Sequence, residues 1–298
     1  MKPERITESL CRLGECPIWC ERTRRLYWVD SRGPALHVLD HASGKHASYP
    51  LPEVVGSICL REDGGLLAAM VTGIYALSPE GAIGPRIAEA VPNHPDNRFN
   101  DGRCDRAGRF IVGTMNDKAR DPTGVLWSLG TDGRLTAMEG DVIVPNSLAF
   151  SPDDTVMYFA DTYRHAIHRF DYDIETGRIS NKQLFSDRTS APGRPDGSAM
   201  DADGCLWNAE YAGGRVVRYT PDGKIDRVVE LPVSQPSCCA FGGAQLDELY
   251  ITTARQRLSD DELKAQPLAG SLFVVRPGVK GLPEGRYRGD VNQLGAAA

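Results

Sequence analysis

The sequence predicts an all-β fold, a six-bladed β-propeller whose blades are four-stranded antiparallel sheets. Three observations support this prediction: a strand–turn–strand unit occurs six times, its copies are evenly spaced, and no stretch shows sustained helical periodicity. The copies start 41 to 50 residues apart, a spacing typical of propeller repeats. We therefore expect residues 1–298 to form one propeller domain. A pair of β-sandwiches is the alternative architecture, and the even spacing disfavours it.

Each copy of the repeat begins with a polar residue and continues through a short apolar strand, a turn with Gly or Asp, and a second apolar strand. The copies start at Glu15, Ser57, Asn100, Asn146, Asp196 and Ser237. A third strand follows, as in ALHVLD and GIYALS, and Asp-Gly or Thr-Gly turns lead to a more polar fourth strand. We expect the N-terminal strand around Glu4–Leu10 to complete the last blade, because closing the ring removes exposed sheet edges.

The composition is that of an ordinary globular protein, with 41% hydrophobic and 25% charged residues and a net charge of −6. Runs of Lys or Arg never exceed two residues, which argues against a nucleic acid or a membrane surface as a partner. The N-terminus lacks the apolar core of a signal peptide, so we expect a cytoplasmic protein, a monomer or weak oligomer. In that compartment the eight cysteines should be reduced thiols.

The residues that start the repeats should meet at one end of the propeller channel, because the innermost strand of every blade lines that channel. All six carry a side-chain oxygen and precede an apolar strand. Taken singly, each is better explained as a polar residue at the start of a strand. Taken together, they favour a hard divalent cation, for which Glu15 and Asp196 would supply negative charge and Asn146 a neutral oxygen.

Several longer segments carry further information. The most specific are GECPIW (Gly14–Trp19), NRFNDGR (Asn97–Arg103), GTM (Gly113–Met115) and PNSLAFSPD (Pro145–Asp153). In this order and spacing they resemble the regucalcin (senescence marker protein 30) and gluconolactonase family, and the resemblance extends over nearly the whole chain. It implies a six-bladed propeller that holds one divalent metal cation at the mouth of its channel.

The resemblance also implies roles for individual residues. It implies metal ligands at Glu15, Asn146 and Asp196, and leaves the ion open between calcium, magnesium, manganese, zinc and ferrous iron. The residues that it implies at the substrate are Arg98, Asn100, Asn116 and Asp117. The chain reads GTMNDK where relatives commonly carry a Glu at or near this segment, so the sugar preference stays open.

We therefore expect a divalent-metal-dependent lactone hydrolase that acts on a small-molecule sugar lactone, an aldono-1,4- or 1,5-lactone of the glucono, xylono or arabino type. The cation would stabilise the oxyanion and lower the pKa of a water, and Asp196 would accept the proton of that water. Two alternatives are a metal-dependent phosphotriesterase or esterase and a non-catalytic cation-binding propeller. Arg98 and Asn100 favour the lactonase, because a protein that only binds cations needs no donors to a substrate.

Overall fold

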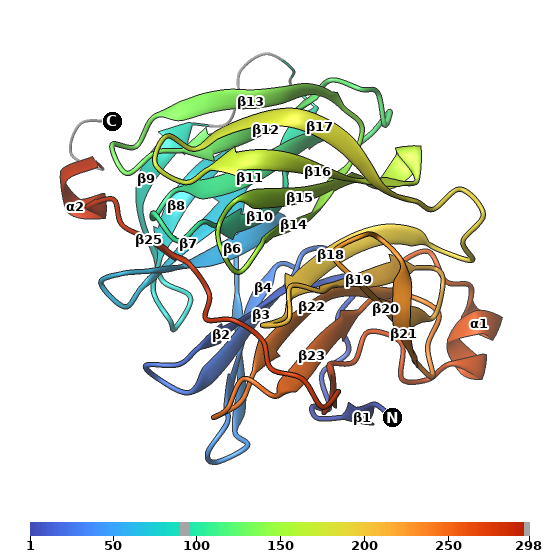
Figure 1. Cartoon of the computed structure of the whole chain (residues 1–298). Coiled ribbons are helices and arrows are strands. Elements are labelled where there is room, and N and C mark those ends of the chain that lie inside the picture. Colours follow the sequence, from blue (N-terminus) through green and yellow to red (C-terminus); the bar gives the residue numbers. More distant parts are fainter. Residues whose placement is uncertain (90–93, 95, 295–298) are drawn as a thin grey trace.

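The structure, a computed structural model, describes residues 1–89, 94 and 96–294. Its strands form six sheets, and the innermost strand of each sheet contacts the innermost strands of the two neighbouring sheets. The sheets therefore close into a ring around a central channel (Figure 1). The predicted six-bladed β-propeller is confirmed.

Each blade contains four antiparallel strands, which follow one another from the channel outward. Blades one to three are β2 (Gly14–Cys20), β3 (Arg25–Asp30), β4 (Ala35–Asp40) and β5 (His46–Pro50); β6 (Val55–Arg61), β7 (Leu66–Met70), β8 (Gly73–Leu77) and β9 (Ile83–Glu89); and β10 (Asn97–Cys104), β11 (Phe110–Asn116), β12 (Gly124–Leu129) and β13 (Leu135–Val142). Blades four to six are β14 (Pro145–Phe150), β15 (Val156–Asp161), β16 (Ala166–Asp173) and β17 (Arg178–Asp187); β18 (Arg194–Met200), β19 (Leu206–Tyr211), β20 (Arg215–Tyr219) and β21 (Ile225–Glu230); and β22 (Pro236–Gly242), β23 (Glu248–Thr253), β24 (Phe273–Val275) and β1 (Glu4–Arg5).

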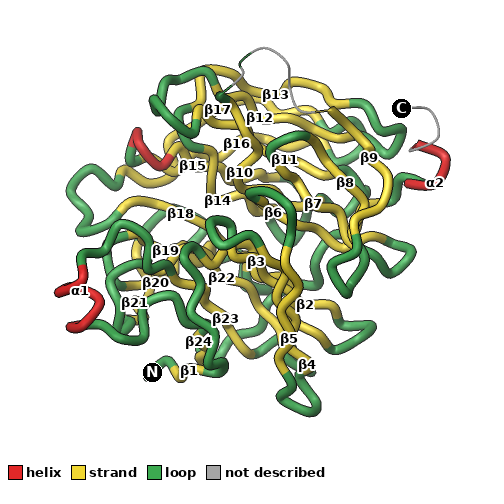
Figure 2. Tube along the Cα trace, turned by 180° about the vertical axis from the view of Figure 1, so that it is seen from behind, coloured by secondary structure: helices red, strands yellow, loops and turns green. Residues whose placement is uncertain are grey.

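Both ends of the chain fasten the ring. Strand β1 pairs antiparallel with β24, with Glu4 opposite Val274, so the N-terminal strand completes the last blade as predicted. Near the other end, β25 (Arg286–Tyr287) pairs in parallel with β6, the innermost strand of blade two. This parallel strand was not predicted. Figure 2 shows the N-terminus beside β24 and the C-terminal helix α2 (Val291–Leu294) on the far side of the ring, near β9.

Helical structure is confined to short segments in the described part of the chain. Besides α2, these are η1 (Thr162–Arg164) and α1 (Asp260–Ala265). Helix α1 begins with a capping box, in which Ser259 and Glu262 satisfy each other's backbone amides. Six residues are too few to show a helical period, which explains why the sequence did not predict α1. None of these helices is long and apolar enough to cross a membrane.

The apolar core lies between neighbouring blades, because alternate side chains of each strand point to opposite faces of its sheet. Between blades one and two, for example, Val29 and Leu36 pack with Ile58 and Ala68, and none of the four is exposed. Burying one large aliphatic side chain of this kind contributes about 1.5–3 kcal/mol. All eight cysteines are buried and free, in agreement with the prediction of reduced thiols.

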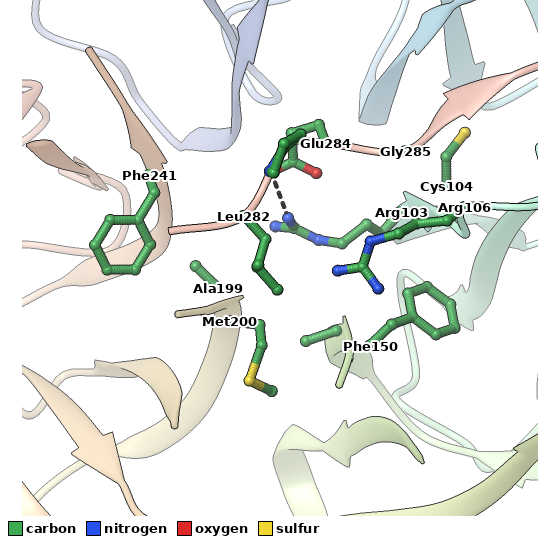
Figure 3. A pocket seen from close by; sticks show the side chains of 12 residues that line it. Arg103, Cys104, Arg106, Phe150, Ala199, Met200, Phe241, Leu282, Glu284 and Gly285 are labelled. Atoms are coloured by element: carbon green, nitrogen blue, oxygen red, sulfur yellow. Dashed lines mark hydrogen bonds and ion pairs between the residues drawn. The ribbon is translucent and has the colours of Figure 1, made fainter. Parts of the chain in front are cut away.

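The chain itself covers one end of the channel, where the innermost strands finish (Figure 3). Arg103 donates a 2.6 Å hydrogen bond to the Glu284 carboxylate and a 2.8 Å bond to the Ser198 carbonyl. Glu284 belongs to the C-terminal segment, which crosses the channel at this end on its way to β25. A small cavity of about 30 Å³ remains beside the pair, lined also by Phe150, Met200, Phe241 and Leu282.

One buried carboxylate organises the turn between β18 and β19. Asp201 accepts hydrogen bonds from the Cys205 amide (2.9 Å), the Trp207 indole (2.9 Å) and the Arg218 guanidinium (2.8 Å). It thereby links three strands of blade five. Arg218 is only 7% exposed and also contacts Asp203, whose side chain is exposed, at 2.9 Å.

Replacing this carboxylate should weaken blade five. We expect Asp201→Asn to lower the free energy of unfolding by about 2–4 kcal/mol, because the buried Arg218 loses its buried charged partner. Asp203→Asn removes an exposed carboxylate from the same guanidinium and should cost less than about 1 kcal/mol. Urea unfolding of both variants measures the difference, and equal losses would contradict the importance of burial.

Candidate active site

A pocket opens at the other end of the channel, where the innermost strands begin. It encloses about 550 Å³, its mouth included. The residues from the innermost strands that line it are Glu15, Arg98, Asn100, Asn146, Arg194 and Asp196. The structure therefore brings together five of the seven site residues predicted from the sequence, which come from blades one, three, four and five.

A β-bulge in each innermost strand aims these side chains at the pocket. In all six blades the pairing with the second strand shifts register near the start of the repeat, for instance after Glu15, Asn146 and Pro195. Cys16 and Ser147, which follow the first two, have positive φ angles of 48° and 62°. An extra residue at a bulge bends the strand and redirects its side chain. In blades one, three, four and five, the local fold thus presents the residue that starts the repeat to the channel mouth.

Two of the six residues that start the repeats do not reach the pocket. In blade two the bulge falls on Gly56, and Ser57 is fully buried instead. A side chain at position 56 is excluded, because a Cβ on Gly56 would lie 2.4 Å from the Phe99 carbonyl oxygen. In blade six, the Ser237 hydroxyl donates to the Gly14 carbonyl. The expectation of six converging oxygen-bearing side chains is therefore wrong, and four line the pocket.

Glu15 and Asp196 form a pair of acidic groups with no cationic partner within 4.0 Å among residues 1–89, 94 and 96–294. Burial, followed by the charge of Asp196, raises the pKa of Glu15 well above its ordinary value. Burial, followed by the charge of Asp101, does the same to the pKa of Asp196. Like charges held together in a buried place are costly unless a cation compensates them.

The two asparagines of the pocket are held in defined orientations. The Asn146 amide nitrogen donates to the Thr162 hydroxyl at 2.7 Å, which directs its oxygen toward Asn100, whose amide nitrogen lies 3.4 Å away. The Asn100 amide nitrogen also donates to the Pro145 carbonyl at 2.9 Å. Asn146 thus offers a neutral oxygen beside the two carboxylates. No cluster of three or more His, Cys, Asp or Glu side chains suited to a metal occurs in the described part of the chain, so any ligand set at this pocket combines carboxylates with amides.

Arg98 is a buried cation at the wall of the pocket, with 5% of its surface exposed. It donates to the Asn100 side-chain oxygen at 2.9 Å and to the Phe99 carbonyl at 2.8 Å. Its Nε lies 3.0 Å from a carboxylate oxygen of Asp117. Burial lowers the pKa of Arg98 to about 10, so the guanidinium stays charged at neutral pH. These contacts fix the guanidinium beside Asn100.

Asn116 and Asp117, the other two predicted substrate residues, lie behind the wall and do not line the pocket. The Asn116 side-chain oxygen accepts from the backbone amides of Lys118 and Ala119, at 3.0 and 2.9 Å. Asp117 pairs with the guanidinium of Arg32 and with Arg98. Although burial opposes it, hydrogen bonding from Arg32 and the charge of Arg98 lower the pKa of Asp117 to about 2.

Several pocket residues were missed by the sequence analysis. They are Arg32, Arg120, Tyr163, Arg194, Tyr211, Gln256 and Arg257. Most lie in the loops between the second and third strands of their blades, where the copies of the repeat differ in sequence, so the repeat gave no signal for them. The buried Asp101 could have been found from the sequence, because it follows Asn100 in the NRFNDGR segment. It accepts from the Gly102 and Leu148 amides at 2.9 and 3.1 Å, and burial raises its pKa.

A protein-family model described as the SMP-30/gluconolactonase/LRE-like region matches residues 13–255. The chain belongs to this family. The resemblance found in the sequence is thereby confirmed.

Individual members of the SMP-30/gluconolactonase family are similar over nearly the whole chain. A 6-deoxy-6-sulfogluconolactonase of Pseudomonas putida is 42% identical over 278 residues, which cover 93% of this chain and 95% of the relative. An L-arabinolactonase of Azospirillum brasilense is 38% identical over 288 residues and covers 95% of both chains. The crystal structure of a calcium-binding protein, regucalcin, of Agrobacterium tumefaciens str. C58 superimposes with a TM-score of 0.92 at 33% identity and covers 97% of both chains.

Without metal, the acidic pair should destabilise the folded protein. The unfolded chain ionises Glu15 at its ordinary pKa, whereas the folded chain, in which this pKa is raised, resists ionisation. Stability should therefore fall as the pH rises from the unfolded pKa toward the folded one. We expect Glu15→Gln in EDTA to be more stable than wild type at pH 8, on the order of 1 kcal/mol or more, with little difference near pH 4.

Thermal unfolding at both pH values measures this effect. Glu80→Gln, which removes an exposed carboxylate of the same size, serves as the control and should leave stability nearly unchanged at either pH. A Glu15→Gln protein less stable than wild type at pH 8 would show that the carboxylate is not strained.

Proposed function

We propose that this protein is a metal-dependent sugar lactonase, which hydrolyses an aldono-1,4- or 1,5-lactone to the aldonic acid. The observation that carries the proposal is the uncompensated pair Glu15 and Asp196 beside the oriented amides of Asn100 and Asn146. Such a set can bind a cation next to groups that hydrogen-bond to a polyol.

The names of relatives support a lactone as the substrate. Besides the two lactonases described above, a pentonolactonase XacC of Haloferax volcanii is 35% identical over 295 residues, which cover 98% of this chain. The names share hydrolysis of a cyclic sugar ester but differ in the sugar and its substituents. They therefore support the reaction class and leave the particular sugar to the residues of this pocket.

The residues fit a divalent cation. Glu15, Asn146 and Asp196 would hold it, since hard cations prefer carboxylate and amide oxygens and two carboxylates would balance its charge. When bound, such a cation supplies a Lewis acid for the lactone carbonyl and lowers the pKa of a coordinated water. The calcium-binding regucalcin of similar structure supports a divalent cation in this protein without fixing its position or its identity.

Asp196 would receive a proton from the attacking water. Asp196 lies within the bulge of β18. Its backbone carbonyl accepts hydrogen bonds from the Ser147 hydroxyl and from the Asn208 amide, the latter at 2.9 Å. Both partners are fully buried. The carboxylate is therefore presented from a rigid backbone, as general base catalysis requires.

Arg98 and Asn100 would position the sugar. The Asn100 side-chain oxygen accepts from Arg98 and can accept from one sugar hydroxyl as well, while its amide nitrogen is held by the Pro145 carbonyl. Asn116 and Asp117, predicted as substrate residues, would not touch the sugar in this arrangement but would position residues that do. Asp117 fixes Arg32 and Arg98, and Asn116 shapes the turn that carries Asp117.

A cation-binding propeller without catalysis is the second candidate, favoured by the name of the Agrobacterium relative. One assay separates the candidates and includes the phosphotriesterase activity expected as an alternative. Glucono-, xylono- and arabinolactone are compared with paraoxon on EDTA-treated protein, to which each divalent ion is restored in turn. Metal-restored turnover of at least one lactone, and none in EDTA, supports the lactonase. Binding of metal without turnover of any compound supports the second candidate.

Removing the proposed base should abolish turnover while the protein still folds. We expect Asp196→Ala to reduce kcat at saturating metal on the order of 100-fold or more. Asp222→Asn, in an exposed turn of the same blade, is the control and should retain full activity. If Asp196→Ala keeps more than about a tenth of wild-type kcat, the role of this carboxylate is refuted.

Removing the Glu15 carboxylate should mainly lower the affinity of the protein for the metal. Loss of a partner that only orients a metal ligand commonly costs 10- to 100-fold in affinity, so Glu15→Gln should cost about tenfold or more. Calorimetric titration with calcium and with manganese measures the change, with Glu80→Gln as the control. An unchanged affinity for both ions would remove Glu15 from the ligand set.

A further inference from the structure

The pocket is strongly basic on the side away from Glu15 and Asp196. Five arginines line it, namely Arg32, Arg98, Arg120, Arg194 and Arg257, while Glu15 and Asp196 are the only acidic residues that do so in the described part of the chain. These two carboxylates are assigned above to a cation. The arginines therefore need a separate explanation.

One carboxylate behind the wall offsets only part of this charge. Asp117 pairs closely with Arg32 and Arg98 and lies 3.7 Å from Arg120. In the region that the structure describes, no carboxylate lies within 4.0 Å of Arg194 or Arg257. A surplus of positive charge is thus left at the pocket.

Tyr163 lies between the arginines at the mouth of the pocket and contacts them. The Arg194 guanidinium lies 4.8 Å from the centre of the Tyr163 ring, and that of Arg120 lies 5.8 Å from it. Although burial opposes it, Arg257, followed by Arg120 and Arg194, lowers the pKa of Tyr163. Arg120 and Arg194, from separate parts of the chain, therefore converge on one aromatic ring, which attracts them by cation–π interactions without neutralising either. Arg257 contacts the same tyrosine through a side-chain hydrogen bond.

The depth of the arginines indicates which end of a substrate they would meet. Arg98 is buried beside Asn100, Arg120 and Arg194 are half-buried, and Arg257 is exposed. The last three therefore line the mouth of the pocket. Arg120 and Arg257 also have φ angles of 61°, a conformation that non-glycine residues rarely adopt and that is concentrated at functional sites.

We propose that the substrate is an anionic sugar lactone, with a sulfonate or phosphate on the carbon farthest from the lactone carbonyl, and that Arg120, Arg194 and Arg257 bind this group. The inference rests on the lactonase activity proposed above. Guanidinium groups match tetrahedral oxyanions with paired, charge-assisted hydrogen bonds. A neutral hydroxyl at the same place would leave the charges of Arg194 and Arg257 without an anionic partner near the mouth.

The test compares three lactones on the metal-loaded enzyme: glucono-1,5-lactone, its 6-phospho derivative and its 6-deoxy-6-sulfo derivative. We expect kcat/KM for at least one charged lactone to exceed that for gluconolactone about tenfold or more at low salt, and the advantage to shrink at 0.5 M salt. The two charged compounds distinguish sulfonate from phosphate. If gluconolactone is hydrolysed as efficiently as both, the inference is overturned and the lactonase stands.

Variants assign the effect to the arginines. Arg194→Gln and Arg257→Gln should each reduce kcat/KM for the preferred charged lactone on the order of tenfold and change that for gluconolactone less than about threefold. Arg164→Gln, an exposed arginine next to Tyr163 that does not line the pocket, is the matched control and should change neither. Equal losses on charged and neutral lactones in both variants would overturn the proposed contacts.

A binding experiment separates this inference from the proposed function. Wild-type protein is titrated calorimetrically with gluconate, 6-phosphogluconate and 6-deoxy-6-sulfogluconate, none of which requires turnover. At least tenfold tighter binding of one charged acid than of gluconate supports the anion site, and equal binding of all three overturns it. If no lactone is hydrolysed, the lactonase proposal fails, while the titration still decides whether the mouth binds an anion.

Discussion

The burial of two carboxylates close together, with no cationic side chain to pair them, is the constraint on which this site depends. Glu15 and Asp196 lie far apart along the chain, and only closure of the ring brings them to one pocket. Their raised pKa values show that the folded chain holds them against an electrostatic penalty. A fold can maintain such a pair only where the backbone that carries it is fixed by other interactions.

The blades supply those interactions. Side chains of neighbouring blades interlock across every interface described for the core, and buried carboxylates such as Asp201 tie the strands within a blade. Near the pocket, Asn208 and Ser147 fix the bulge that carries Asp196 through its backbone carbonyl. The scaffold is thus stabilised by hydrogen-bonded polar groups such as Asp201 and Ser147, whereas Glu15 and Asp196 in the pocket have no cationic partner within 4.0 Å in the described part of the chain. This division is typical of sites that bind a charged ligand.

The sequence predicts part of this site, and the limits have physical causes. The sixfold repeat revealed Glu15, Asn146 and Asp196, because equivalent positions in a propeller converge on the same end of the channel. It misassigned Ser57, because the position of a bulge depends on strand pairing, which shifts by one residue to Gly56. The arginines of the mouth were not predicted, because Arg120 and Arg257 lie in loops whose sequence differs from blade to blade, and Arg194 precedes the residue that starts its repeat. The parallel strand β25 lies outside the six copies of the repeat and was recognised only in the structure.

The segment that crosses the channel beside Arg103 and Glu284 limits the path by which substrate and product can reach and leave the pocket. Because this segment lies across one end of the channel, substrate and product would enter and leave through the pocket at the other end. Substrate and product would then occupy the same pocket in turn, so the product should act as a competitive inhibitor. Hydrolysis of a lactone adds a carboxylate to the departing molecule, which must leave past the guanidinium groups at the mouth of the pocket.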